Sequence, residues 1–249
     1  NTTATSGYFE MKEKLNEKSA VTTRQVPFTI NANGTSSVSV SVNDTYESNM
    51  YMYLNNAVTD LVYLSDGTWN IEKSAATTIS KFNVTNETNV VNNINEMRLM
   101  RNVSVTGVSK DYITIYKTMK GGGLEQNVAN YKSLLFSANA VGAGSVKVTL
   151  IKKSIQDWDN QYSYKMALNG SQEYSINLSQ FTSSKYNTAI IANDITAVNF
   201  AFNNDRGIAT TMTINVSNAR FSNNSATTTP TPIVVAKSIA TYPNPSVGG

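Results

Sequence analysis

Along most of the chain, hydrophobic and polar residues alternate, which is typical of β-strands that bury one face and expose the other. Turns rich in Gly or Asn interrupt the alternation, for example at 142–144 and at Asn169-Gly170. Many short strands separated by such turns predict an all-β fold, an antiparallel β-sandwich of the jelly-roll type. The alternating hydrophobic positions are Val103 and Val105; Ile113 and Ile115; Leu134, Phe136 and Ala138; Val146, Val148 and Leu150; Tyr162, Tyr164, Met166 and Leu168; Tyr174, Ile176 and Leu178; Val198, Phe200 and Phe202; and Met212, Ile214 and Val216.

The N-terminal third follows a weaker pattern. Residues 8–20 carry Glu and Lys at helical spacing, with Glu10 and Lys14 as a supporting pair, which predicts a short helix or a connector. Further on, Asn33-Gly34 lies between two alternating runs at 26–30 and 38–42, which indicates a β-hairpin. Asp66-Gly67 predicts another turn.

These patterns divide the chain into several expected parts. A smaller β-rich module precedes the sandwich, and a Thr- and Pro-rich segment without periodicity follows it as a linker. The expected parts are a connector with helical character at 1–20, the small β-rich module at 21–75, the jelly roll at 79–222, the linker at 223–238 and a C-terminal segment at 239–249.

The composition removes several kinds of chemistry. The chain has no Cys and no His, which excludes disulfides, thiolate metal sites, Ser-His-Asp triads and the commonest general base near neutral pH. The most conspicuous acids, Asp157 and Asp159, flank Trp158, and we predict a solvated strand edge with both acids on one face. Two acids this close could alternatively bind calcium or the hydroxyls of a sugar, but their spacing does not build a catalytic pair across a glycosidic bond. We therefore expect that the chain is not an enzyme.

The distribution of charge and of apolar residues limits the kinds of binding partner that we expect. The net charge is +3 and is spread along the chain, so there is no basic stripe for nucleic acid. No apolar run is long enough to span a bilayer. We expect neither a nucleic-acid partner nor a membrane span.

Aromatic faces beside amides or charged groups are the combination that binds sugars, because the ring stacks on the pyranose while polar groups hydrogen-bond its hydroxyls. Tyr112 and Tyr116 alternate with the hydrophobic residues Ile113 and Ile115, so we expect the tyrosines to face solvent. Trp158 lies in a polar segment. A structural alternative stays open for each: Tyr is common in strands, Trp158 can pack, and 203–207 can be only a turn. The predicted ligand-binding residues are Tyr112, Tyr116, Trp158, Asn160, Asn204 and Arg206.

The last residues, "IATYPNPSVGG" at 239–249, follow the Thr/Pro-rich segment. They resemble the start of the C-terminal sorting domain of type IX secretion substrates of Bacteroidetes, which begins with Tyr-Pro-Asn-Pro and a Gly shortly after. The residues that carry the resemblance are Tyr242, Pro243, Asn244 and Pro245. The resemblance implies export by the type IX secretion machinery and a secreted or outer-surface location.

A second resemblance covers residues 79–222. The "SLLFSANAVGAG" segment, the Val-rich run at 146–150, the Trp segment and the closing "INVSNARF" are similar, in this order, to the galactose-binding-like jelly roll of many carbohydrate-binding modules. In many members an acidic residue near the last strand helps to hold a structural calcium ion. Here that place is Val216-Ser217-Asn218, without an acid. We expect no cofactor, and a structural calcium ion is left open.

Together these observations predict a non-catalytic accessory region of a secreted or surface protein that binds a polysaccharide or surface glycan. Two alternatives remain. The chain could be a structural or adhesion module without a sugar site, or the C-terminal tail of a larger secreted hydrolase.

Overall fold

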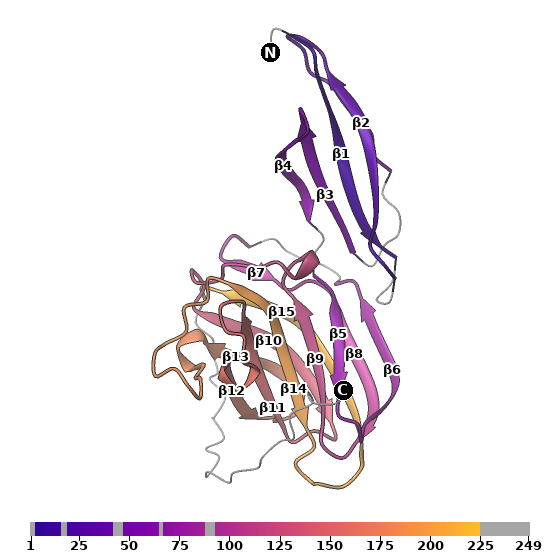
Figure 1. The fold of residues 1–249 in the computed structure, drawn as a ribbon. Coiled ribbons are helices and arrows are strands. Elements are labelled where there is room, and N and C mark those ends of the chain that lie inside the picture. The colour runs from indigo at the N-terminus through magenta and orange to yellow at the C-terminus, as the bar shows by residue number, and fades with distance from the viewer. Residues whose placement is uncertain (1–2, 16–18, 42–46, 65–66, 88–92, 225–249) are drawn as a thin grey trace.

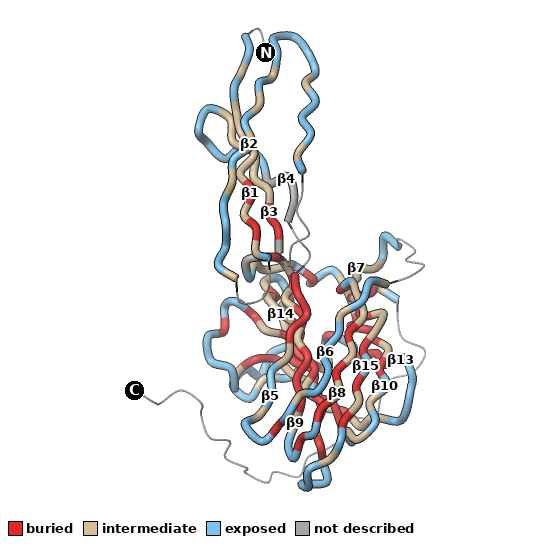
Figure 2. The backbone as a smooth tube through the Cα atoms, turned by 90° about the vertical axis from the view of Figure 1, so that its right-hand side faces the viewer, coloured by how far each residue is buried: buried red, intermediate tan, exposed pale blue. Residues whose placement is uncertain are grey.

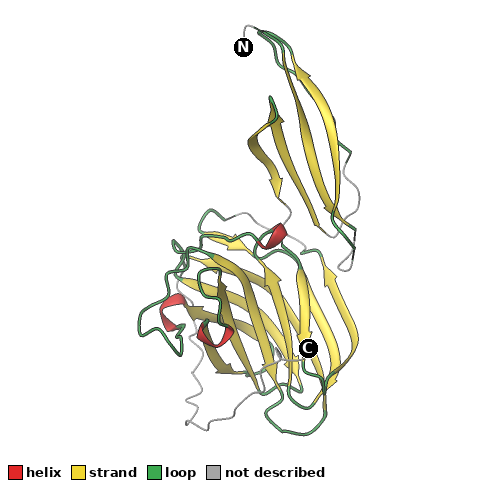
Figure 3. Cartoon of the chain, viewed as in Figure 1, coloured by secondary structure: helices red, strands yellow, loops and turns green. Residues whose placement is uncertain are grey.

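The computed structural model describes residues 3–15, 19–41, 47–64, 67–87 and 93–224. Its strands form three antiparallel sheets, and its described helical elements are single 3-10 turns (Figures 1 and 3). Two of the sheets face each other and make a jelly-roll sandwich, so the predicted fold class is confirmed. The third is a separate sheet of N-terminal strands at one end of the sandwich (Figure 1).

The two sheets of the sandwich differ in size. The five-stranded sheet has the order β12-β11-β14-β9-β5, and the six-stranded sheet has the order β13-β10-β15-β8-β6, with β7 paired to β15. The strands of the five-stranded sheet are β12 (Tyr162–Ala167), β11 (Ser145–Lys152), β14 (Ile195–Asn203), β9 (Tyr112–Thr118) and β5 (Trp69–Lys73). Those of the six-stranded sheet are β13 (Gln172–Asn177), β10 (Ser133–Val141), β15 (Thr210–Ser222), β8 (Asn102–Ser109), β6 (Thr78–Thr85) and β7 (Glu96–Arg98).

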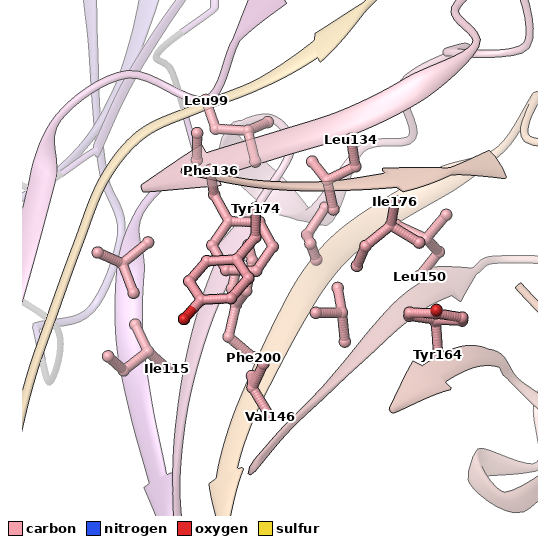
Figure 4. Packing of buried hydrophobic residues seen from close by; sticks show 14 of the residues in the cluster. Leu99, Ile115, Leu134, Phe136, Val146, Leu150, Tyr164, Tyr174, Ile176 and Phe200 are labelled. Carbon is pink, nitrogen blue, oxygen red and sulfur yellow. The ribbon is translucent and has the colours of Figure 1, made fainter. Parts of the chain in front are cut away.

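The core lies between these two sheets. Phe200 of β14 meets Phe136 of β10 edge to face at 4.9 Å, and Phe136 in turn stacks on Tyr174 at 5.5 Å (Figure 4). Tyr162 and Tyr164 are buried in the same cluster, as their register with Met166 predicts. The alternation along each strand therefore correctly predicted which residues face inward.

The helix predicted within residues 8–20 is wrong. Residues Thr5–Lys14 form β1, which pairs with β2 (Thr22–Ile30) on one side and β3 (Glu47–Leu54) on the other. The Glu and Lys residues at helical spacing are outweighed by the alternation of Phe9 and Met11 with polar neighbours, which pairing on both edges reinforces. Met11 is fully buried.

The predicted hairpin at 26–42 is also wrong. β2 pairs with the preceding strand β1, and residues 38–41 form no strand. Asn33 does adopt a left-handed conformation in a turn, as an Asn-Gly pair favours, but residues 35–41 form no strand beside β2, although Arg24 of β2 donates a hydrogen bond to the Ser41 carbonyl. Asp66 of the other predicted turn lies outside the described residues.

The boundary of the small module also differs from the prediction at both ends. The N-terminal sheet, of order β2-β1-β3-β4, begins in the predicted connector and ends with β4 (Ala57–Leu64). β5 pairs with β9, so Trp69–Lys73 belongs to the sandwich rather than to the module at 21–75. Figure 2 shows the buried residues concentrated in the sandwich and few in the N-terminal sheet.

The C-terminal predictions have no structural description. Tyr242, Pro243, Asn244 and Pro245 lie outside the described residues, as does most of the predicted linker. Within the described part of the chain, no helix is both long and apolar enough to cross a membrane.

Candidate functional site

The outer face of the five-stranded sheet is built by the polar half of each alternating strand. Strand pairing aligns these residues into rows that cross the sheet, because antiparallel register places directly opposite side chains on the same face. The central row runs Asn70, Tyr116, Asn199, Thr149 and Ser163, one residue from each of β5, β9, β14, β11 and β12. The next row runs Glu72, Thr114, Ala201, Lys147 and Lys165.

Tyr112 and Tyr116 both lie on this outer face. Ile113 and Ile115, which alternate with them on β9, are fully buried in the core. Both tyrosines are half-buried, and Tyr116 is the direct neighbour of Asn70 and Asn199 across the two adjacent strands. The predicted outward direction of the tyrosines is therefore correct.

The middle of the face holds polar side chains that the protein does not use. Thr114, Thr149 and Asn199 are only 4–5% exposed. Their side chains make no hydrogen bond to any other residue in the part of the chain that the structure describes. Their polar atoms are not among the described side-chain atoms that are fully buried and without a partner, so they reach solvent and are available to hydrogen-bond a ligand.

One edge of the face is flanked by the turn that carries Trp158. The segment Trp158–Asn160 is a 3-10 turn, so the predicted solvated strand edge at 157–159 is wrong. Asp157 caps the turn: its two oxygens accept hydrogen bonds from the Asp159 backbone, at 3.1 Å, and from the Asn160 side chain, at 2.7 Å. These local hydrogen bonds stabilise a turn in this polar segment in place of an extended strand.

A second loop fixes this turn from the other side. Ser183 and Ser184 donate hydrogen bonds of 2.6 Å to the carbonyls of Asn160 and Asp159. Trp158 is 51% exposed on this rigid support. The Asn160 side chain hydrogen-bonds within the turn, whereas the exposed Trp158 ring can stack on a ligand at the edge of the outer face.

Asn204 and Arg206, both predicted ligand-binding residues, differ in burial: Asn204 is buried and Arg206 is exposed. Asn204 is 6% exposed, and its amide donates to the carbonyls of Ser109 and Ile208 at 2.7 and 2.6 Å. Its side-chain oxygen accepts the backbone N–H of Arg206 at 3.1 Å. We therefore assign Asn204 to holding the 203–208 turn rather than to contacting a ligand, while Arg206 is exposed on that turn.

The sequence prediction missed Asn199, Lys147 and Lys165. Each alternates with core residues on its own strand, so the polar positions of β14, β11 and β12 indicated that they face outward. The position of Asn199 beside Tyr116, and of the two lysines in the next row, could not be predicted from the sequence. It depends on β9 and β11 both pairing with β14 and on β12 pairing with β11.

The place where the family resemblance puts a calcium ligand is occupied by cationic side chains. Asn218 accepts a hydrogen bond from the Arg98 guanidinium at 2.9 Å, and Arg220 donates to the Asn218 carbonyl at 2.9 Å. Arg98 is itself paired with Glu87, and Arg220 with Glu96 and Glu173, so the carboxylates around Asn218 are engaged by guanidinium groups. Across the described ranges, no three acidic side chains are grouped in a way that could hold a metal ion.

Comparisons with known proteins find distant structural neighbours. No family model and no curated protein matches the chain. Among solved structures, a family 11 carbohydrate-binding module from Clostridium thermocellum in complex with a β-1,3-1,4-mixed-linked tetrasaccharide is 14% identical, with a TM-score of 0.43, 62% of this chain covered and 88% of that chain covered.

Two further neighbours are equally distant. A family 30 carbohydrate-binding module is 12% identical, with a TM-score of 0.38 and coverage of 66% of this chain and 82% of that one. An exo-β-agarase is 11% identical, with a TM-score of 0.39 and coverage of 62% of this chain and 24% of that one. These values assign the chain to none of their families, so its function has to follow from its own residues.

Proposed function

We propose that the outer face of the five-stranded sheet binds a polysaccharide and does not cleave it. The observation that carries this proposal is the unused hydrogen-bonding capacity of Thr114, Thr149 and Asn199 in the row positions beside Tyr116. Sugars present hydroxyls in the ring plane and C–H groups on the ring faces. An amide and two hydroxyls next to a tyrosine complement both.

The shape of the face suits an extended chain. The rows cross five neighbouring strands, which lie about 4.8 Å apart, so the central row spans roughly 19 Å. That length accommodates several sugar units. Small side chains such as Ala201 between Thr114 and Lys147 leave room for a chain to approach the sheet.

The distribution of the acids in the described part of the chain supports binding without cleavage. Glycoside hydrolysis needs two carboxyl groups on opposite sides of the bond. The oxygens of Asp157 are engaged in capping its own turn. Asp159 and Asp205 both lie on the side of Lys147 and Lys165, and Glu72 lies across the sheet at its β5 edge. The proposal holds equally if the chain is the C-terminal part of a larger hydrolase.

The proposal is tested with Tyr116→Ala and Asn199→Ala in affinity gel electrophoresis and calorimetry against a panel of plant and algal polysaccharides. We expect retardation of the unmodified protein by at least one polymer. Each substitution should weaken binding about tenfold, since about 1.4 kcal/mol corresponds to one stacking contact or hydrogen-bonded group.

The chain offers matched controls for both substitutions. Tyr51→Ala removes a tyrosine from the N-terminal sheet, and Asn215→Ala removes an exposed asparagine from the outer face of the six-stranded sheet. Both should leave binding unchanged. Retardation by no polymer, or equal losses in the controls, would show that this face is not a glycan site and would favour an adhesion module.

We also propose that the protein is secreted or held at the outer surface after type IX export. Tyr242, Pro243, Asn244 and Pro245, behind a Thr/Pro-rich segment, support this. Intact-mass analysis of the protein from its native host measures the mature C-terminus. We expect proteolytic cleavage close to Tyr242. A chain that is found inside the cell and is not cleaved near Tyr242 would contradict the export route.

A further inference from the structure

Two lysines lie side by side on the proposed binding face. Lys147 of β11 and Lys165 of β12 are directly opposite each other in the antiparallel register. Like charges in this position destabilise a sheet, so a pair that serves only folding is unfavourable. The pair adjoins the centre of the face, because Lys147 is also paired with Ala201, and Ala201 with Thr114.

The protein neutralises this pair incompletely. Lys165 approaches Asp205 at 3.9 Å, which is too long for a hydrogen bond, with the lysine side chain 33% and the aspartate side chain 46% exposed. Lys147 has no ion pair or hydrogen bond from its amine to any residue that the structure describes. Its nearest acidic influence is Asp159 in the turn beside Trp158.

The surroundings of Lys147 also disfavour its charge. Desolvation lowers the pKa of its amine below the ordinary lysine value. Asp159, which raises the pKa, and Lys165, which lowers it, have smaller effects. Lys147 is exposed on the outer face, so an anion can reach its amine, and a cation without a close counter-ion attracts such an anion.

We infer that the polysaccharide bound by this face is acidic, with a carboxylate or sulfate group held between Lys147 and Lys165. This inference rests on the proposed glycan binding and adds the charge class of the ligand. Sugar rings would stack at Tyr116 and hydrogen-bond Asn199, and the anionic substituent would lie over the lysine pair, one row away. Carboxylate and sulfate share the chemistry, so the experiment separates them.

The test uses pairs of polymers that differ in charge. Polygalacturonate is compared with its fully methyl-esterified form, and a sulfated galactan with neutral agarose, by calorimetry at low and moderate salt. We expect binding to at least one acidic member, at least tenfold weaker binding to its neutral counterpart, and a decrease with added salt. Whichever pair shows the difference identifies carboxylate or sulfate as the recognised group.

Substitutions then locate the charge. Lys147→Gln and Lys165→Gln should each weaken binding to the acidic polymer about tenfold, because each removes a charge-assisted hydrogen bond. Lys81→Gln is the matched control. Lys81 is exposed and pairs with Thr106, away from the five-stranded sheet. Equal losses from Lys81→Gln would mean unspecific attraction to a basic protein and would overturn the inference.

The outcomes separate this inference from the proposed function. Binding to neutral polymers that depends on Tyr116 and Asn199 but not on the lysines would keep the glycan site and overturn the acidic ligand. Binding to no polymer at all would overturn both. Since all these side chains face outward, no variant should unfold at a clearly lower urea concentration, and the Lys→Gln variants should unfold at the same or a higher one because they relieve the like-charge pair. A midpoint that is not lowered excludes misfolding as the cause.

Discussion

Replacing Phe200 with Ala is expected to lower the free energy of unfolding by about 3–5 kcal/mol. Phe200 is fully buried and joins the sheets: it packs edge to face on Phe136 of the six-stranded sheet and lies 6.1 Å from Trp69 of β5. The substitution therefore removes a large apolar contact area and leaves a cavity at the centre of the sandwich. A domain of this kind is stable by only about 5–15 kcal/mol, so the loss is a large share.

Urea unfolding followed by tryptophan fluorescence measures this effect. Trp69 is 2% exposed in the core and Trp158 is 51% exposed, so Trp158→Phe leaves a signal that reports on the core alone. The matched control is Asn199→Ala on the same strand, which faces outward and should change stability by less than about 0.5 kcal/mol. If Phe200→Ala does not fold, Phe200→Leu should still fold and lose about 1–2 kcal/mol. A loss below about 1 kcal/mol for Phe200→Ala would contradict the central position of this ring.

Replacing Arg98 with Met is expected to lower the free energy of unfolding by about 2–4 kcal/mol, because it leaves the carboxylate of Glu87 buried without a counter-ion. The Arg98 guanidinium contacts Glu87 at 2.8 Å, and the Glu87 side chain is only 5% exposed. One Glu87 oxygen already lacks a hydrogen-bond partner among the described residues. Arg98 also holds Asn218, which has a positive φ of 53° at the irregular pairing of β10 and β15.

A double-mutant cycle isolates the charge contribution. Glu87→Gln combined with Arg98→Met removes both charges and should recover at least half of the loss, since a neutral amide is less costly to bury than an unpaired carboxylate. The measurement is the same urea titration at neutral pH. A double variant as unstable as the sum of the single variants would show that the two side chains contribute independently.

The sequence was sufficient to predict the sandwich, because burial on one face imposes a two-residue period on every strand. Leu134, Phe136, Val146, Val148 and Phe200 are all buried as that period requires. Prediction failed where the period was short or competed with another local pattern. In residues 8–20 the charges at helical spacing concealed a strand, and at 157–159 hydrogen bonds within the segment replaced extension with a 3-10 turn.

The candidate site was predictable only in part. The alternation in β9 placed Tyr112 and Tyr116 on the outer face. The sequence did not indicate that Asn204 is buried and holds its own turn, because a buried turn asparagine and an exposed one look alike in sequence. The sequence also gave no reason to group Lys147, Asn199 and Tyr116, which come from three strands spread over more than eighty residues.

What the sequence by itself determined is therefore the direction of each side chain within its strand, since neighbouring residues on a strand must point to opposite faces. It also determined the available chemistry, since a chain without His or Cys has neither an imidazole nor a thiol to use. Only the tertiary structure decided which strands lie next to each other. That order depends on long-range pairing, which puts Tyr116, Asn199, Thr149 and Lys147 on one surface and sets two lysines opposite each other.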